Sequence, residues 1–136
     1  FQYMIGNVDW SIPMSRNLKI LKPVDGGLNT VVPYDFDFSG IVNVGYAVPA
    51  RDIGQHKVGE RVYLGAELNS SELQSTIQLF KSRQGNFEAM VSDFDLLSRS
   101  DKREILEYLQ SFYTALDNGT VCAEFTAKNC PTVPGK

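Results

Sequence analysis

Four side chains near the start of the chain are of the types that hold a divalent cation. They are Asp9, Asn17, Asp35 and Asp37, the last two within the segment VPYDFDFSG, residues 32–40. Carboxylate and amide oxygens are hard ligands that suit Mg²⁺ and Ca²⁺. In phosphoryl transfer, one carboxylate orients the attacking hydroxyl while other oxygens hold Mg²⁺ against the nucleotide phosphates. The order Asp, Asn, Asp therefore raises the hypothesis of a Mg²⁺-dependent phosphoryl-transfer site.

A β-hairpin is expected between Asn17 and Asp35. The run NLKILK (17–22) alternates polar and apolar residues, VDGG (24–27) supplies a turn, and NTVVPYDF (29–36) supplies the second run. Pro33 cannot donate a ladder hydrogen bond, so it marks an edge or the point where pairing stops. We therefore expect Asp35 to lie just past the second strand.

Residues 70–118 contain no proline and are predicted to be helical. One helix of about 24 residues should begin after an N-cap at Ser70 or Ser71, with Gly85 as its weakest point. The next helix should be capped by Ser100 and end at Asn118. The apolar stripes expected in the core are Leu73, Ile77, Phe80, Phe87, Val91 and Phe94 in the first helix, and Ile105, Leu109, Phe112 and Leu116 in the second.

The fold class predicted from these elements is α+β, with a small hairpin and irregular loops followed by a helical subdomain. The chain of 136 residues is expected to be a single domain or a fragment of a longer protein. Its parts are a loop and hairpin region with the acidic site (1–65), a helical subdomain (66–118) and a tail with two cysteines (119–136). The opening run FQYMIGNVDW reads as a helix already under way, so we expect a processed or excised piece.

The segments GNVDW (6–10) and VPYDFDFSG, separated by Asn17, resemble the C-terminal lobe of atypical bacterial kinases, in particular the CotH-type spore-coat family and related uncharacterised bacterial proteins. In that family the metal-binding segment reads Pro-Trp-Asp-Leu-Asp or similar. HipA-type kinases begin their catalytic loop with a comparable Gly-Asn-x-Asp. The run ERVYLG (60–65) and the paired helices are also similar to the uncharacterised group, so the resemblance extends over most of the chain.

The resemblance implies a role for each residue of the acidic site. Asp9 would be the catalytic aspartate of a kinase-like phosphotransferase, and Asn17 and Asp35 would hold Mg²⁺ with ATP, with Asp37 as a possible second carboxylate ligand. It further implies that the Gly-rich phosphate loop and the strand lysine precede Phe1, in an N-terminal lobe outside this sequence. The partners implied are a nucleotide and an unknown protein or small-molecule acceptor.

The sequence departs from the kinase pattern in its spacing. Kinase catalytic loops place the asparagine about five residues after the aspartate, whereas Asp9 and Asn17 are eight apart. The intervening WSIPMSR (10–16) must therefore bulge. No histidine precedes Asp9.

Other interpretations of the same residues remain open. Asp9 and Asn17 are typical of loops in which side chains bond to nearby backbone, and Asp35 and Asp37 could form the solvated face of a strand. The order Asp35, Asp37, Ser39 also matches the start of a calcium loop, D-x-D-x-S-G, although Tyr46 stands at the twelfth position where a glutamate is expected. The remaining alternative is a non-catalytic extracellular or envelope interaction module with a structural acidic or calcium-binding cluster.

Composition narrows the classes of partner. A net charge of −3 and scattered basic residues argue against a nucleic-acid backbone as partner, and the apolar runs are too short to span a membrane. Cys122 and Cys130 could form a disulfide in an exported protein or stay reduced, so the compartment is left open between an exported or envelope location and the cell interior. With His56 as the one histidine, a zinc site is not expected.

Overall fold

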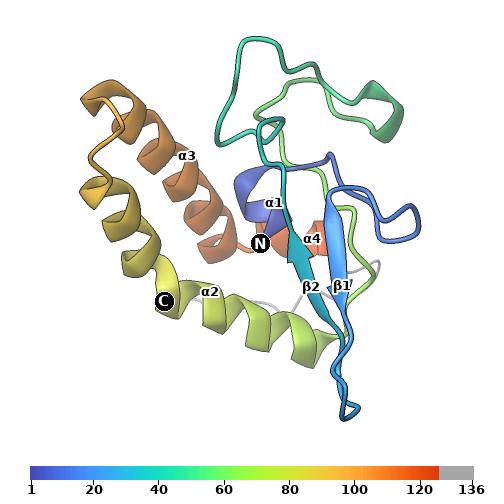
Figure 1. Cartoon of the computed structure of the whole chain (residues 1–136). Helices are drawn as coiled ribbons and strands as arrows, with labels where there is room; N and C mark the ends of the chain where they lie inside the picture. The colour runs from blue at the N-terminus through green and yellow to red at the C-terminus, as the bar shows by residue number, and fades with distance from the viewer. Residues whose placement is uncertain (126–136) are drawn as a thin grey trace. The chain divides into compact units, whose positions relative to one another are not determined.

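The structure is a computed structural model that describes residues 1–125, apart from the side chains of residues 122–124. The chain divides into two units, Phe1–Val62 and Tyr63–Lys136. The first contains a two-stranded antiparallel hairpin, and the second is helical (Figure 1). The predicted α+β class is confirmed.

The first unit begins with a one-turn helix, α1 (Gln2–Ile5), which ends at Gly6. Gly6 has a φ of 65°, in the left-handed region where glycine meets no steric penalty, and its N–H bonds back to the helix. Met4 and Ile5 are buried. The Arg61 side chain donates from Nε to the Met4 carbonyl at 3.0 Å, which joins the two ends of this unit.

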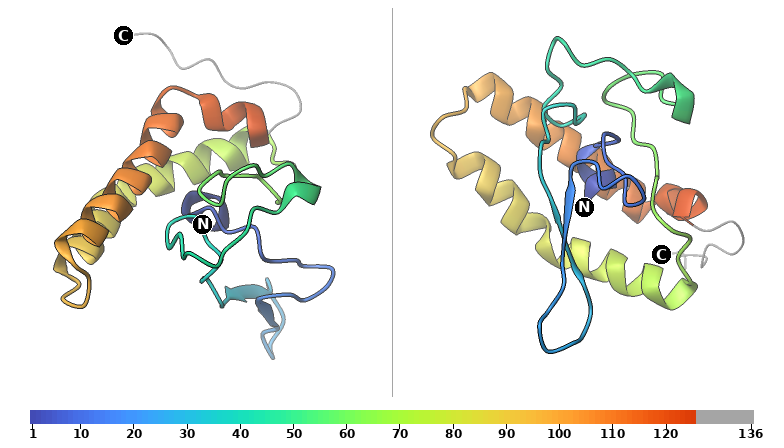
Figure 2. Two further views of the ribbon diagram at one scale, coloured as in Figure 1. Left: turned by 90° about the horizontal axis from the view of Figure 1, so that it is seen from above. Right: turned by 45° about the vertical axis from the view of Figure 1, so that its right-hand side comes forward.

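The hairpin forms where the alternating pattern predicted it. Strand β1 (Leu18–Leu21) pairs with β2 (Thr30–Pro33) in antiparallel register, with Leu18 opposite Pro33 (Figures 1 and 2). The ladder stops at Pro33, which has no N–H to donate. A 3₁₀ turn, η1 (Arg51–Ile53), is the one further regular element before residue 63.

The second unit is built on a long helical hairpin. Helix α2 (Ser70–Asp93) runs unbroken through Gly85, and α3 (Arg99–Asp117) returns alongside it (Figure 2). The expected single helix of 24 residues is confirmed. A short helix, α4 (Thr120–Phe125), begins in the segment predicted to be tail, because the Asn118 side chain accepts a hydrogen bond from the Thr120 N–H at 3.0 Å.

Both predicted N-caps were wrong by one or two residues. Helix α2 is capped by Asn69, whose Oδ1 accepts from two backbone N–H groups while Glu72 bonds back to the Asn69 N–H. This reciprocal capping box favours Asn69 over the serines that follow it. Helix α3 is capped by Ser98, which accepts from the Asp101 N–H, and not by Ser100.

The helical core is aromatic. Phe112 packs edge-on against Phe80 at 5.7 Å between ring centroids and against Tyr113 at 5.2 Å. Tyr113 is buried and donates its hydroxyl to the Phe80 carbonyl at 3.3 Å. Of the ten predicted stripe residues, four are buried: Leu73, Leu109, Phe112 and Leu116. Five are half-buried, and Phe94 lies past the end of α2 and is 50% exposed.

Phe112→Ala should lower the free energy of unfolding of the helical unit by about 3–5 kcal/mol, because it removes a buried ring and leaves a cavity. Chemical denaturation followed by circular dichroism measures this. The control is Leu79→Ala on the exposed side of α2, where Leu79 is 56% exposed and the expected cost is below about 1 kcal/mol. Equal small losses for both variants would show that the core is misassigned.

Candidate functional site

The loop that carries Asp9 is shaped by Asn7. Asn7 is buried, and its Oδ1 accepts a hydrogen bond from the Asp9 N–H at 2.9 Å. The Asn7 backbone carbonyl accepts a hydrogen bond from the Trp10 indole N–H at 3.1 Å. The side-chain Nδ2 of Asn7 donates to Gln2 Oε1 at 3.1 Å. This Asx turn fixes the direction in which Asp9 leaves the buried segment.

The extra residues between Asp9 and Asn17 form a closed loop. Ser11 and Arg16 pair as an isolated antiparallel bridge, with both N–H to carbonyl distances at 3.0 Å. The predicted bulge is therefore confirmed, since residues 12–15 project as a small loop from a closed base. This closure brings Asn17 back beside Asp9 despite the eight-residue spacing.

Asn17 binds Asp9 directly. Its Nδ2 donates to the Asp9 carbonyl at 2.7 Å and to the Asp9 carboxylate Oδ2 at 2.9 Å. Arg16 pairs through Nε with the other carboxylate oxygen, Oδ1, at 3.3 Å. With its nitrogen committed to Asp9, the Asn17 amide keeps its oxygen Oδ1 as the atom that can coordinate a cation.

The hairpin connects Asn17 to Asp35. The Tyr34 N–H donates to the Asn17 carbonyl at 3.1 Å, so the chain just past β2 lies against the chain just before β1. Asn17 and Asp35 both have positive φ values, 52° and 61°. Asn and Asp tolerate this left-handed conformation better than most residues, but it still costs energy and is found often at functional sites.

The segment after β2 is a turn and not a continuing strand. The Ser39 carbonyl accepts from the Val42 and Asn43 N–H groups, and the Gly40 N–H donates to the Gly6 carbonyl at 3.1 Å. The alternative of a solvated strand face at Asp35 and Asp37 is thereby excluded. The hydrogen bond between Gly40 and Gly6 instead joins the turn that carries Asp35 and Asp37, here called the acidic turn, to the segment that leads into Asp9.

Asp35 is exposed, and the pKa of its carboxyl group is raised above the ordinary value of 3.8. The largest cause is a hydrogen bond with Asp37, followed by the negative charge of Asp37, partial desolvation and the charge of Asp9. The negative charges of Asp37 and Asp9 thus both act on the Asp35 carboxyl group. A cation would relieve their repulsion.

The acidic site has few protein ligands for a metal. Among the side chains that the structure describes, no three of His, Cys, Asp or Glu are grouped closely enough to hold a metal on their own. Mg²⁺ in nucleotide sites commonly uses only one or two carboxylates and takes its other ligands from phosphates and water. Asn17 Oδ1 and the exposed Asp35 carboxylate are oxygen atoms of the types that could hold such an ion.

The calcium-loop pattern is not reproduced as an EF-hand. The flanking segments are β2 and a turn, where an EF-hand needs helices. Ser39 is fully buried and its hydroxyl has no hydrogen-bond partner among the described residues. The Tyr46 hydroxyl, at the twelfth position, donates to Asp37 Oδ2 at 2.9 Å.

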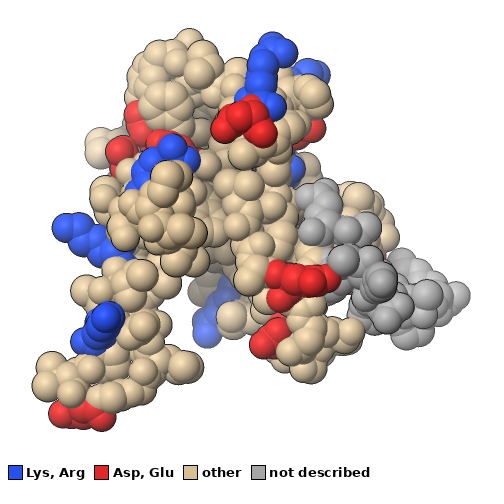
Figure 3. All heavy atoms as spheres, turned by 90° about the vertical axis from the view of Figure 1, so that its right-hand side faces the viewer, with Lys and Arg blue, Asp and Glu red and all other residues tan. Residues whose placement is uncertain are grey.

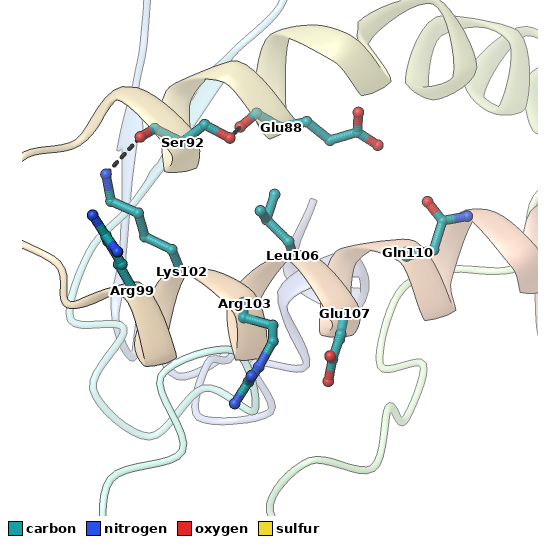
Figure 4. A pocket seen from close by; sticks show the side chains of 8 residues that line it. All are labelled: Glu88, Ser92, Arg99, Lys102, Arg103, Leu106, Glu107 and Gln110. Atoms are coloured by element: carbon teal, nitrogen blue, oxygen red, sulfur yellow. Dashed lines mark hydrogen bonds between the residues drawn. The ribbon is translucent and has the colours of Figure 1, made fainter.

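A hollow lies between α2 and α3 (Figure 4). Its eight lining side chains are mostly charged or polar and of both signs. Lys102 crosses the gap to donate to the Ser92 carbonyl, while Arg103 and Glu107 point away from α2. Its polar groups do not converge on one point, so this hollow is a weaker candidate than the acidic site.

Surface charge and hydropathy add two observations. On the face drawn in Figure 3, Lys and Arg side chains lie apart and among acidic ones, with no single basic patch. No helix in the described part of the chain combines the length and the apolar character needed to cross a membrane. The alternatives left open for Cys122 and Cys130, a disulfide or free thiols, depend on side chains that lie outside the described part of the chain.

The predicted residues Asp9 and Asn17 are in direct contact, and Asp35 and Asp37 lie together in the next turn. The sequence patterns did not identify three further residues that contact the acidic residues of the site: Asn7, Arg16 and Tyr46. The pattern Asn-x-Asp in GNVDW was a usable signal for the Asx turn of Asn7. Arg16 and Tyr46 reach the site through loop closures that no local pattern encodes.

Comparison of the chain with protein-family models, with curated proteins and with solved structures finds no match. The kinase-like interpretation therefore continues to rest on the residues and on the contacts among them.

The raised pKa of Asp35 can be measured by carbon NMR of the carboxyl groups. A carboxyl that binds its proton more tightly in the folded chain makes the free energy of unfolding increase as the pH falls through its folded pKa. The increase levels off below the unfolded value. In Asp37→Asn the pKa of Asp35 should fall toward 3.8, because the hydrogen bond and charge that raise it are removed or weakened. Titration of Asp35 at the same pH in both proteins would contradict this coupling.

Proposed function

We propose that residues 1–62 form the catalytic and metal-binding part of a kinase-like, Mg²⁺-dependent phosphotransferase. The observation that carries the proposal is the contact of Asn17 with Asp9. The amide nitrogen is held by Asp9, which leaves the amide oxygen for a metal beside Asp35. A carboxylate for the acceptor hydroxyl and ligands for Mg²⁺ are the two requirements of phosphoryl transfer.

Each residue has a separate task in this proposal. Asp9 would accept a hydrogen bond from the acceptor hydroxyl and orient it for attack. Asn17 and Asp35 would hold Mg²⁺, which when bound with ATP neutralises charge on the phosphates. Asp37, whose carboxylate is already bonded to Tyr46, would assist Asp35 without being a principal ligand.

The remaining requirements of the reaction point to partners. Nucleotide binding would need an N-terminal lobe with a phosphate-binding loop and a lysine, as the resemblance implies. The acceptor would be a protein or a small molecule with a free hydroxyl. The alternative function is a non-catalytic extracellular or envelope interaction module with a structural acidic or calcium-binding cluster.

Asp35→Asn should abolish Mg²⁺-dependent nucleotide binding in the full-length protein and Mn²⁺ binding in this chain. The melting temperature should change little, since an exposed ligand contributes little to folding. Mn²⁺ serves as a paramagnetic substitute whose binding broadens the amide NMR signals of Asn17 and Asp35, and added Mg²⁺ should reverse the broadening.

The matched control is Asp25→Asn, which removes an exposed carboxylate from the hairpin turn. It should leave both binding measurements unchanged. Equal Mn²⁺ affinity in the parent and Asp35→Asn proteins would reject the metal assignment. Mn²⁺ binding without any nucleotide binding by the full-length protein would favour the non-catalytic alternative.

A further inference from the structure

The turn at the tip of the hairpin contains the one Asp–Gly pair of the sequence, Asp25 and Gly26. The turn lies beyond the ends of β1 and β2 (Figure 1), and every residue from 21 to 30 is exposed. Val24 and Leu28, on either side of the pair, are 100% and 94% exposed. Exposure of this extent leaves the main chain of the turn without tertiary packing in the described part of the chain.

An Asp–Gly pair places a nucleophile and an electrophile in adjacent residues, so their reaction is intramolecular. The backbone nitrogen of Gly26 attacks the side-chain carbon Cγ of the Asp25 carboxylic acid, and the new C–N bond closes a five-membered succinimide ring. The bond from Cγ to the hydroxyl oxygen breaks, and the hydroxyl leaves as water with the proton of the Gly26 N–H.

The succinimide is opened by water, which is the one other reactant. Addition of water at Cγ breaks the new C–N bond and restores aspartate. Addition at the main-chain carbonyl carbon of Asp25 instead breaks its bond to the Gly26 nitrogen. The second product is isoaspartate, in which the main chain passes through Cβ and Cγ and the former carbonyl carbon becomes the free carboxyl group.

The structure leaves both reacting groups of this pair available. Neither the Gly26 N–H nor the Asp25 carboxylate has a hydrogen-bond or ion-pair partner among the described residues. Gly26 has a φ of 80°, and a Cβ placed on it would meet no atom within 4 Å. Because glycine also permits wide rotation of the main chain, the nitrogen can reach Cγ without breaking a tertiary contact.

The one Asn–Gly pair of the sequence, Asn118 and Gly119, is restrained in a way that Asp25 is not. Asn118 closes α3, where its N–H donates to the Thr114 carbonyl at 3.0 Å. Its Oδ1 accepts from the Thr120 N–H at 3.0 Å, at the start of α4. Rotation of the main chain toward ring closure would break this bond, so the helix ends protect the pair.

We propose that Asp25 is a modification site at which the folded protein converts aspartate to isoaspartate without an enzyme. The product adds one atom to the main chain of the turn. Residues 22–29 separate the two strands, so the turn can absorb this atom while the pairing of β1 with β2 keeps its register. The reaction does not depend on metal binding or catalysis at the acidic site.

Incubation of the purified, folded chain in neutral buffer, followed by peptide mapping, tests the proposal. Isoaspartate shifts the retention of its peptide at unchanged mass, and an isoaspartate-specific methyltransferase labels it. A synthetic peptide of residues 20–30 is the unrestrained reference, and Asp25 should convert at the same rate in the folded chain as in this peptide. Asn118 should convert more slowly in the folded chain than in a peptide of residues 113–121.

Two variants isolate the reaction at the tip. Asp25→Glu should lose the isomer at an unchanged melting temperature, because attack on the longer side chain needs a six-membered ring that forms much more slowly. Asp25→Asn should form isoaspartate faster than the parent, because ammonia leaves an uncharged amide more readily than water leaves a carboxyl group. Metal binding by Asp25→Asn is therefore measured on freshly prepared protein.

Absence of isoaspartate at Asp25 in the folded chain would overturn the proposal, whether or not the peptide converts. A conversion rate in the folded chain well below that of the peptide would also overturn it, because the tip would then restrain the pair. An equal yield of the isomer in the parent and in Asp25→Glu would show that the signal arises at another residue.

Discussion

The contact between the Asn17 side chain and Asp9 is the interaction on which the candidate site depends. Two hydrogen bonds from one amide nitrogen join residues that lie eight apart in the sequence. The closed loop at Ser11 and Arg16 makes that contact possible, and Arg16 occupies the carboxylate oxygen that Asn17 leaves open. Loss of this contact would leave Asp9 and the hairpin as independent elements with no common site.

The hairpin returns the chain from Asn17 to the acidic turn that carries Asp35 and Asp37. A two-stranded hairpin is only marginally stable in water, and contacts at and just beyond its base hold this one in place. Tyr34 bonds to Asn17 at the base, and Gly40 bonds to Gly6 beyond Asp35. The energetic cost of two left-handed residues, Asn17 and Asp35, is thus borne by a small set of backbone hydrogen bonds.

Local sequence patterns predicted the elements better than they predicted the contacts of the site. The alternation of NLKILK and the proline at position 33 were enough for the hairpin, and apolar spacing was enough for α2 and α3. The N-cap of α2 was misplaced because Asn69, Ser70 and Ser71 are all residue types that can cap a helix. Only the spacing of Asn69 to Glu72, which forms the capping box, distinguishes Asn69 from the two serines. Tyr46 was beyond prediction, since its contact with Asp37 depends on a turn closed by backbone bonds. The grouping of Asp9 with Asn17 was anticipated from residue order, and its hydrogen bonds were not.

The central claim is that Asn17 and Asp35 bind one cation beside Asp9. Anomalous diffraction from crystals soaked in Mn²⁺ tests it most directly, because it locates the metal without reference to any activity. We expect an anomalous peak about 2.1 Å from Asn17 Oδ1 and from an Asp35 carboxylate oxygen. A peak bound elsewhere, or an Asn17 amide whose oxygen faces Asp9 in place of its nitrogen, would contradict it.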